Sequence, residues 1–90
     1  MKIKNGFTMR KLVDTWVILP YSKATVSFNG MITLNESGVL LWNMLENGCT
    51  RENMAEALTK EYEVSFDEAL ADVDAFIEKL DKAGCIDFDA

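Results

Sequence analysis

The chain has 90 residues, which is enough for one domain with a modest core. Its composition is 49% hydrophobic and 10% aromatic, which excludes an intrinsically disordered protein. No apolar run approaches the ~20 residues that a membrane-spanning helix needs, and no hydrophobic stretch follows Lys2 and Lys4 as in a secretory signal.

The first third of the sequence is rich in β-branched and aromatic residues and predicts short strands. Asn29-Gly30 lies between two alternating runs, residues 25–28 and 31–34, and this dipeptide is typical of a tight β-hairpin turn. Residues 21–24, which follow the single proline Pro20, are expected to form a loop. Two earlier strands, separated by a break at Asp14, are expected at Phe7–Val13 and Thr15–Leu19.

The stretch after residue 34 predicts a buried helix from Glu36 to about Asn47. Asn35 can accept a hydrogen bond from the first free backbone N–H groups, and Gly48 supplies a left-handed stop. The helix is apolar on nearly all sides, as expected for a central helix.

Two further helices are expected, the first starting at Thr50. The second opens with a capping box, in which Ser65 and Glu68 each satisfy a backbone N–H, and it ends at Gly84. Residues 85–88 then read as a short returning strand. The apolar stripe of the last helix, which should face the core, consists of Phe66, Leu70, Val73, Ile77 and Leu80.

This order of elements predicts an α+β fold of the winged helix-turn-helix type. The chain has no internal repeat, low-complexity segment or linker, so residues 1–90 are expected to form a single domain. Residues 1–34 carry a net charge of +4 and residues 35–90 a net charge of −10. Such an asymmetry is either a solvated acidic helical face or a dipolar surface that attracts partners.

The residues of most catalytic sites are missing from the sequence. There is no histidine, which excludes Ser-His-Asp and Cys-His arrangements, and the five glycines form no phosphate-binding loop. Asp72 and Asp74 are two positions apart on a predicted helix and should point in different directions. The chain is therefore expected to be no enzyme and to hold no cofactor or metal.

The two cysteines are 36 positions apart and too sparse for a zinc site. Cys49 precedes a predicted helix, whose N-terminus could lower the pKa of its thiol. No second thiol or base is expected beside it, so we interpret both residues as reduced thiols of a cytoplasmic protein.

The sequence resembles the PqqD-like family (pyrroloquinoline quinone biosynthesis protein D) and the wider group of RiPP recognition elements. The similarity extends over almost the whole chain, although residues 21–30 form a longer connection than expected and the N-terminal arm is short. The residues that carry it are Met31-Ile32-Thr33-Leu34-Asn35, Trp42, Leu45, Asn47-Gly48, Thr50, Met54-Ala55, Leu58, Tyr62, Ala71-Asp72-Val73, Phe76, Leu80 and Gly84-Cys85-Ile86.

This resemblance implies an N-terminal three-stranded antiparallel sheet packed on a three-helix bundle with a short C-terminal strand. It also implies a non-catalytic protein that binds the leader of a ribosomally made precursor peptide by β-strand addition. The leader would be presented to a modifying enzyme such as a radical SAM protein. A homodimer is left open.

Strand addition would place the leader beside residues 31–34, in a groove whose other wall is the last helix. Phe76 lies to one side of the apolar stripe of that helix, near Ala69 and Asp72. The predicted peptide-binding residues are Met31, Ile32, Thr33, Leu34, Ala69, Asp72, Val73 and Phe76.

Two alternatives belong to other functional classes. A winged helix-turn-helix is often a DNA-binding regulator, but residues 66–82 carry six acids and two lysines, a charge that repels a duplex. No binding to nucleic acid or membrane is therefore expected. The other alternative is a structural subunit of a larger assembly.

Overall fold

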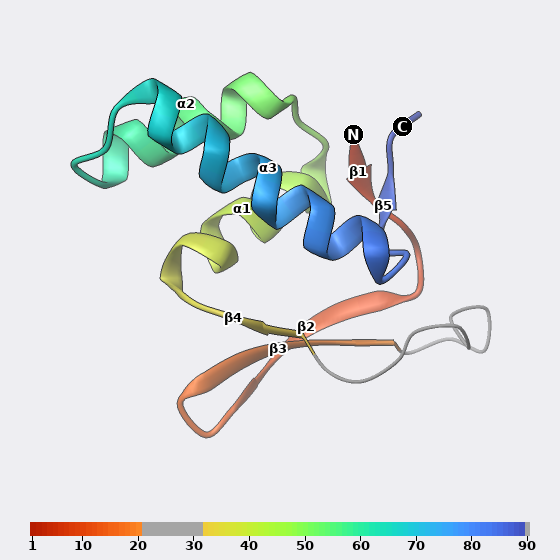
Figure 1. Ribbon diagram of the computed structural model, residues 1–90. Coiled ribbons are helices and arrows are strands. Elements are labelled where there is room, and N and C mark those ends of the chain that lie inside the picture. The colour runs from red at the N-terminus through yellow and green to blue at the C-terminus, as the bar shows by residue number, and fades with distance from the viewer. Residues whose placement is uncertain (21–31, 90) are drawn as a thin grey trace.

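Three helices lie over one side of an antiparallel sheet in the computed structural model, which describes residues 1–20 and 32–89 (Figure 1). The predicted α+β class is confirmed. The elements, in chain order, are β1 (Lys2–Ile3), β2 (Phe7–Leu12), β3 (Thr15–Pro20), β4 (Ile32–Leu34), α1 (Glu36–Asn47), α2 (Arg51–Glu61), α3 (Phe66–Lys82) and β5 (Ile86–Asp87).

Among the described residues, the main sheet has three strands in the order β2-β3-β4, and the pairings between them are antiparallel. β2 and β3 form a hairpin with a two-residue turn at Val13 and Asp14, so the predicted break at Asp14 is confirmed. β4 pairs with β3 only, with Thr33 opposite Val17, and is therefore an edge strand among the described residues. The predicted Asn29-Gly30 turn and Met31 lie outside the described residues.

A second, two-stranded sheet joins the two ends of the chain. Lys2 pairs with Asp87 and Ile3 with Ile86, and the backbone N–H of Lys4 donates to the carbonyl of Cys85 at 2.8 Å. The C-terminal strand was predicted, although it is shorter than residues 85–88. Its partner β1 was not predicted, because two residues are too few to show the period-2 alternation of a strand.

The predicted helix starts are confirmed by their caps. The side chain of Asn35 accepts from the N–H of Gly38 at 2.9 Å, and that of Ser65 accepts from the N–H of Glu68 at 3.1 Å. Thr50 caps α2 in the same way, so α2 begins one residue later than expected. Gly38 lies where α1 meets the sheet with little room to spare, because a Cβ there would lie 3.3 Å from the side chain of Leu34.

The core lies between the helices and the inner face of the main sheet. Its largest fully buried side chain is Trp42 of α1. The predicted core stripe of α3 is partly wrong, because Phe66 is 39% exposed whereas the small Ala69 is fully buried. The buried line of α3 is therefore centred on Ala69, Val73 and Leu80. The core cluster contains Ile18, Ile32, Leu34, Leu41, Trp42, Leu45, Met54, Ala55, Leu58, Ala69, Val73, Leu80, Cys85 and Ile86.

Candidate functional site

A groove lies between edge strand β4, the N-terminal end of α1 and one side of α3. It has a volume of about 510 Å³. Apolar side chains and polar groups share its walls, and an edge strand forms part of its rim. The groove is lined by Thr33, Leu34, Asn35, Ser37, Gly38, Leu41, Leu58, Asp72, Ala75, Phe76 and Lys79.

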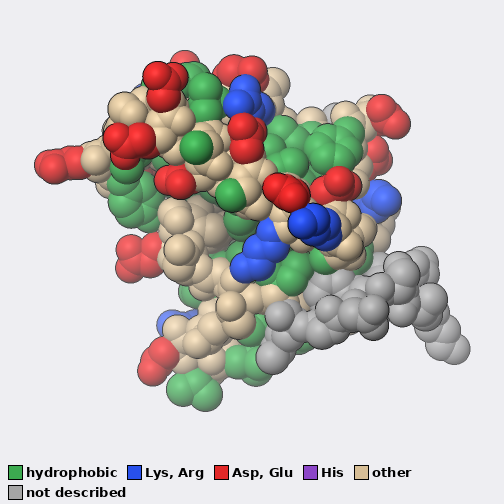
Figure 2. All heavy atoms as spheres, viewed as in Figure 1, with side chains coloured by type: hydrophobic (Ala, Val, Ile, Leu, Met, Phe, Trp, Pro, Cys, Tyr) green, Lys and Arg blue, Asp and Glu red, His purple; other side chains and the backbone are tan. Residues whose placement is uncertain are grey.

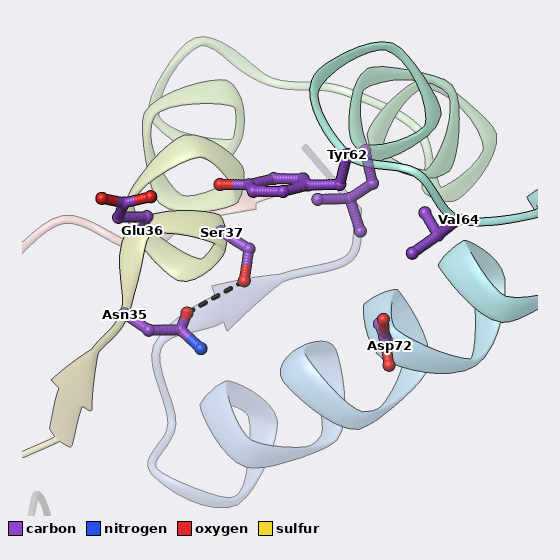
Figure 3. A pocket seen from close by; sticks show the side chains of 7 residues that line it. Asn35, Glu36, Ser37, Tyr62, Val64 and Asp72 are labelled. Carbon is purple, nitrogen blue, oxygen red and sulfur yellow. Dashed lines mark hydrogen bonds between the residues drawn. The ribbon is translucent and has the colours of Figure 1, made fainter.

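The groove continues into a second hollow of about 420 Å³ beside the C-terminal end of α2. The two share four lining residues, so we describe them as one groove: Asn35, Ser37, Leu58 and Asp72. Figure 3 shows Tyr62 reaching from the end of α2 toward Glu36 and Ser37, with Asp72 on α3 across the space. The groove therefore runs from the middle of β4, past the start of α1, to α2.

Four of the eight predicted site residues line this groove, namely Thr33, Leu34, Asp72 and Phe76. The side chains of Ile32 and Leu34 point into the core, and the side chain of Thr33 between them is exposed. Met31 lies outside the described residues.

Ala69 and Val73 do not line the groove as predicted, although Val73 was also part of the predicted core stripe. Both are fully buried in the core, so neither has surface to offer a ligand. The expected stripe followed the large apolar residues of α3. The structure instead turns the helix so that small Ala69 packs inward, which moves Asp72 and Phe76 to the rim of the groove.

Lys79, Ala75 and the start of α1 also belong to the groove, and none of them was predicted to do so. Lys79 is seven positions after Asp72 and three after Phe76, a spacing that places all three on one side of a helix. This signal was present in the sequence. The contribution of α1 was not, because it depends on how α1 and α3 pack.

The open edge of β4 carries a main-chain acceptor that faces the groove. The carbonyl of Thr33 accepts a hydrogen bond from Nζ of Lys79 at 3.4 Å. Lys79 belongs to α3 and lines the groove, so this carbonyl points away from β3. The N–H and C=O of one residue point to the same side of a strand, and the Thr33 N–H therefore faces the groove as well.

Asp72 and Asp74 lie in different surroundings, as their spacing predicted. Asp74 forms a two-pronged ion pair with Arg51 of α2, with Nε–Oδ1 at 2.5 Å and Nη2–Oδ2 at 2.7 Å. The hydrogen bonds from Arg51 lower the pKa of the Asp74 carboxyl, and those to Asp74 raise the pKa of Arg51. Asp72 faces the groove instead, so the two carboxylates do not form an acid–base pair.

The two thiols are not activated. Burial raises the pKa of Cys49 above its usual value, contrary to the lowering that a helix N-terminus could have caused. Burial also raises the pKa of Cys85 to about 11, which keeps this thiol protonated at neutral pH. Within the described ranges, no three His, Cys, Asp or Glu side chains come together to hold a metal. No helix in this part of the chain is long and apolar enough to cross a bilayer.

The model of the family Coenzyme PQQ synthesis protein D (PqqD) matches residues 15–86, which include β3, β4, all three helices and the start of β5. The chain belongs to the PqqD family. No curated protein matches this PqqD-family chain.

Two solved structures share the fold of this PqqD-family protein. One is described as TbiB1 in complex with the TbiA(beta) leader peptide. It has a TM-score of 0.72 and 24% identity, over 91% of this chain and 90% of that chain. The other is described as lasso peptide synthetase B1 complexed with the leader peptide. It has a TM-score of 0.73 and 23% identity, over 93% of both chains.

Proposed function

We propose that this protein binds the leader segment of a ribosomally made precursor peptide and presents it to a peptide-modifying enzyme, without catalysing a reaction itself. The observation that carries this proposal is the open edge of β4 beside the groove. There, an open main-chain edge, an aromatic side chain and charged side chains lie within reach of one extended peptide.

Strand addition explains how such a site would work. An edge strand offers backbone groups to a disordered peptide, and these hydrogen bonds supply affinity that depends little on sequence. Selectivity comes from alternate side chains of the guest, which would contact Phe76 on α3. The proposed contact residues are Thr33, Leu34, Asp72 and Phe76, with Lys79 added from the geometry of the groove.

Family membership and the two similar structures support this proposal. Both solved structures contain a leader peptide according to their descriptions. They share the fold of this chain over at least nine-tenths of its length. The raised pKa values of the two thiols argue only against a cysteine nucleophile, because protonated thiols are poor nucleophiles.

The finer parts of the proposal concern fold type, partner and location. We infer that α1, α2 and α3 correspond to the helices of a winged helix-turn-helix that binds peptide rather than DNA. α3 carries six acids and two lysines and would repel a duplex. A radical SAM enzyme is the partner class that the family resemblance implies. A cytoplasmic location would agree with the two free cysteines, Cys49 and Cys85.

A titration followed by amide NMR tests the proposal. The protein is titrated with synthetic leader segments of short peptides encoded near its gene, and with scrambled versions as controls. We expect a cognate leader to shift the amides of β4 and of the groove side of α3. Shifts confined to other parts of the chain would contradict the proposed site.

A backbone substitution tests strand addition itself. Thr33→Pro removes the N–H that faces the groove and leaves the pairing of β4 with β3 in place, since proline is tolerated on the open side of an edge strand. We expect this variant to fold and to lose most leader binding. Thr33→Val is the matched control, because it keeps the N–H and should bind nearly as the wild type does.

A further inference from the structure

The groove side of α3 carries two opposite charges. Asp72 and Lys79 both line the groove, with Phe76 between them. Seven positions on a helix correspond to a rotation of about 20° and a rise of about 10 Å, so both side chains face the same way two turns apart. If the groove binds a peptide, as the proposed function requires, these two charges bear on which peptides it accepts.

Among the described residues, Lys79 has no strong acceptor for its ammonium group at its end of the groove. Its bond to the Thr33 carbonyl is 3.4 Å long, beyond the usual range for an N–H···O hydrogen bond. Glu78, the adjacent acid, pairs with Lys82 at 3.0 Å. A guest strand that donates to the Thr33 carbonyl would displace Lys79. The ammonium group would then need a new acceptor, and a carboxylate on the guest meets that need best.

The Asp72 end has the opposite character. Two acids, Asp72 and Glu36, lie among the residues that line it, and none of these residues is basic. The hydroxyl of Ser37 donates to Oδ1 of Asn35, as Figure 3 shows, so it is not directed at Asp72. Arg51, the nearest arginine in sequence, is engaged by Asp74.

The start of α1 adds a positive partial charge at this end. It amounts to about half an elementary charge, which is less than the charge of the two carboxylates. The Asp72 end therefore favours a cation on the guest. In Figure 2, acidic side chains gather over the helical half of the visible face, and few lie over the sheet. Lys79 is therefore a basic side chain of the groove in a largely acidic surrounding.

We propose that Lys79 and Asp72 determine specificity by selecting a guest strand with an acidic side chain beside Lys79 and a basic one beside Asp72. Residues on one face of an extended strand repeat every two positions, or about every 7 Å. A separation of about 10 Å lies between two and four positions, and the long side chains of lysine and arginine cover the difference. The guest motif is therefore an acid and a base two or four residues apart.

Selection from a displayed library of random peptides tests this motif. The library is panned against the folded wild-type protein and against Lys79→Glu. We expect wild type to enrich peptides with an acid and a base at the stated spacing, and Lys79→Glu to enrich a base where wild type selected the acid. Lys82→Glu is the matched control, because it makes the same charge change at an exposed position of α3 that does not line the groove.

The affinities of the selected peptides then measure the contribution of the charges at Lys79 and Asp72 directly. We expect Lys79→Glu to weaken the affinity for a wild-type-selected peptide about tenfold. Changing the acid of that peptide to lysine should restore its affinity for the Lys79→Glu variant. Asp72→Lys should likewise weaken the affinity for the selected peptide, and changing the base of that peptide to glutamate should restore it. Lys82→Glu should stay within about twofold of wild type, as expected for an exposed charge outside the groove.

Amide NMR on the selected complexes separates charge selection from strand addition. If selected peptides shift the amides of β4 but show no charge preference and no loss with Lys79→Glu, the charge-selection proposal is overturned and strand addition stands. If no peptide is retained, or if shifts avoid β4 and α3, the proposed function fails and the specificity proposal fails with it.

Discussion

The two sides of α3 differ in almost every respect although they belong to one helix. One side consists of Ala69, Val73 and Leu80, all fully buried and packed against the core. The other carries Asp72, Phe76 and Lys79, which line the groove beside β4. The first side provides packing energy, and the second leaves polar and aromatic groups accessible. A short domain can in this way place stability and recognition on the same helix with few shared residues.

This division predicts that stability and binding can be changed separately. Substitutions on the buried side should lower stability and leave the affinity of the folded protein unchanged. Substitutions on the groove side should weaken peptide binding and change stability little. Phe76 is the residue that tests the boundary, because it lines the groove and also packs against the core.

The largest effect is expected for Leu80→Ala on the buried side. Leu80 is fully buried, so the truncation leaves a cavity and should lower the free energy of unfolding by about 2–5 kcal/mol. Urea denaturation measures this loss, and a titration of the folded fraction should give unchanged peptide affinity. A loss of affinity in fully folded protein would show that the two sides of α3 are not independent.

Phe76→Ala should weaken peptide binding by about 1–3 kcal/mol, because it removes an aromatic contact from the middle of the groove. Ile77→Ala is the matched control. Ile77 is also half-buried against the core, but it does not line the groove. Both variants should lose some stability, and only Phe76→Ala should lose binding in calorimetric titrations. Equal losses of affinity would place the anchor elsewhere.

Much of the fold could be predicted because local signals and tertiary structure agree. The caps at Asn35 and Ser65 satisfy backbone N–H groups that every helix leaves unpaired, so they mark helix starts wherever they occur. The break at Asp14 and the C-terminal strand could also be found from local sequence. Strand β1 could not be found, because two residues carry no pattern and are held by distant β5.

The site was harder to predict than the fold. The rotation of α3 about its axis depends on which face packs more closely against the core. The predicted stripe included the large Phe66, which is partly exposed, and omitted the small Ala69, which is buried. Asp72 and Phe76 were placed in the groove because they are near the edge of either stripe. Ala69 was placed there incorrectly because a rotation of a few tens of degrees separates a buried residue from a rim residue. Val73 was assigned both to the core stripe and to the groove, and only the core assignment agrees with its burial.

A smaller, favourable effect is expected far from α3 in sequence, at the tip of the β2–β3 hairpin. Val13 has φ of 58°, a conformation that is strained for a β-branched residue, and its side chain is 91% exposed. Val13→Gly should therefore raise the free energy of unfolding by about 1 kcal/mol. Val13 does not line the groove, so peptide affinity should not change. Urea denaturation checks the gain, and a lower stability would show that the tip is not strained.

The smallest effect concerns Asp74, which lies on α3 two residues from Asp72 and is paired with Arg51 of α2. The pKa of Asp74 is lower in the folded protein than its ordinary value, because Arg51 donates hydrogen bonds to the ionised form. The ion pair therefore stabilises the fold fully above the unfolded pKa of about 3.9 and loses this contribution as the pH falls through the lower folded value.

Asp74→Asn should accordingly lower stability slightly at neutral pH, and its difference from wild type should shrink on acidification below about pH 4. Asp72→Asn is the matched control. It removes the same charge two residues away, and no ion pair of Asp72 is found in the described part of the chain. Urea denaturation over a pH series measures both. We expect Asp74→Asn to change the pH dependence of stability and Asp72→Asn to weaken only the binding of basic peptides. Identical pH profiles for the two variants would mean that the Arg51 pair adds nothing to the fold.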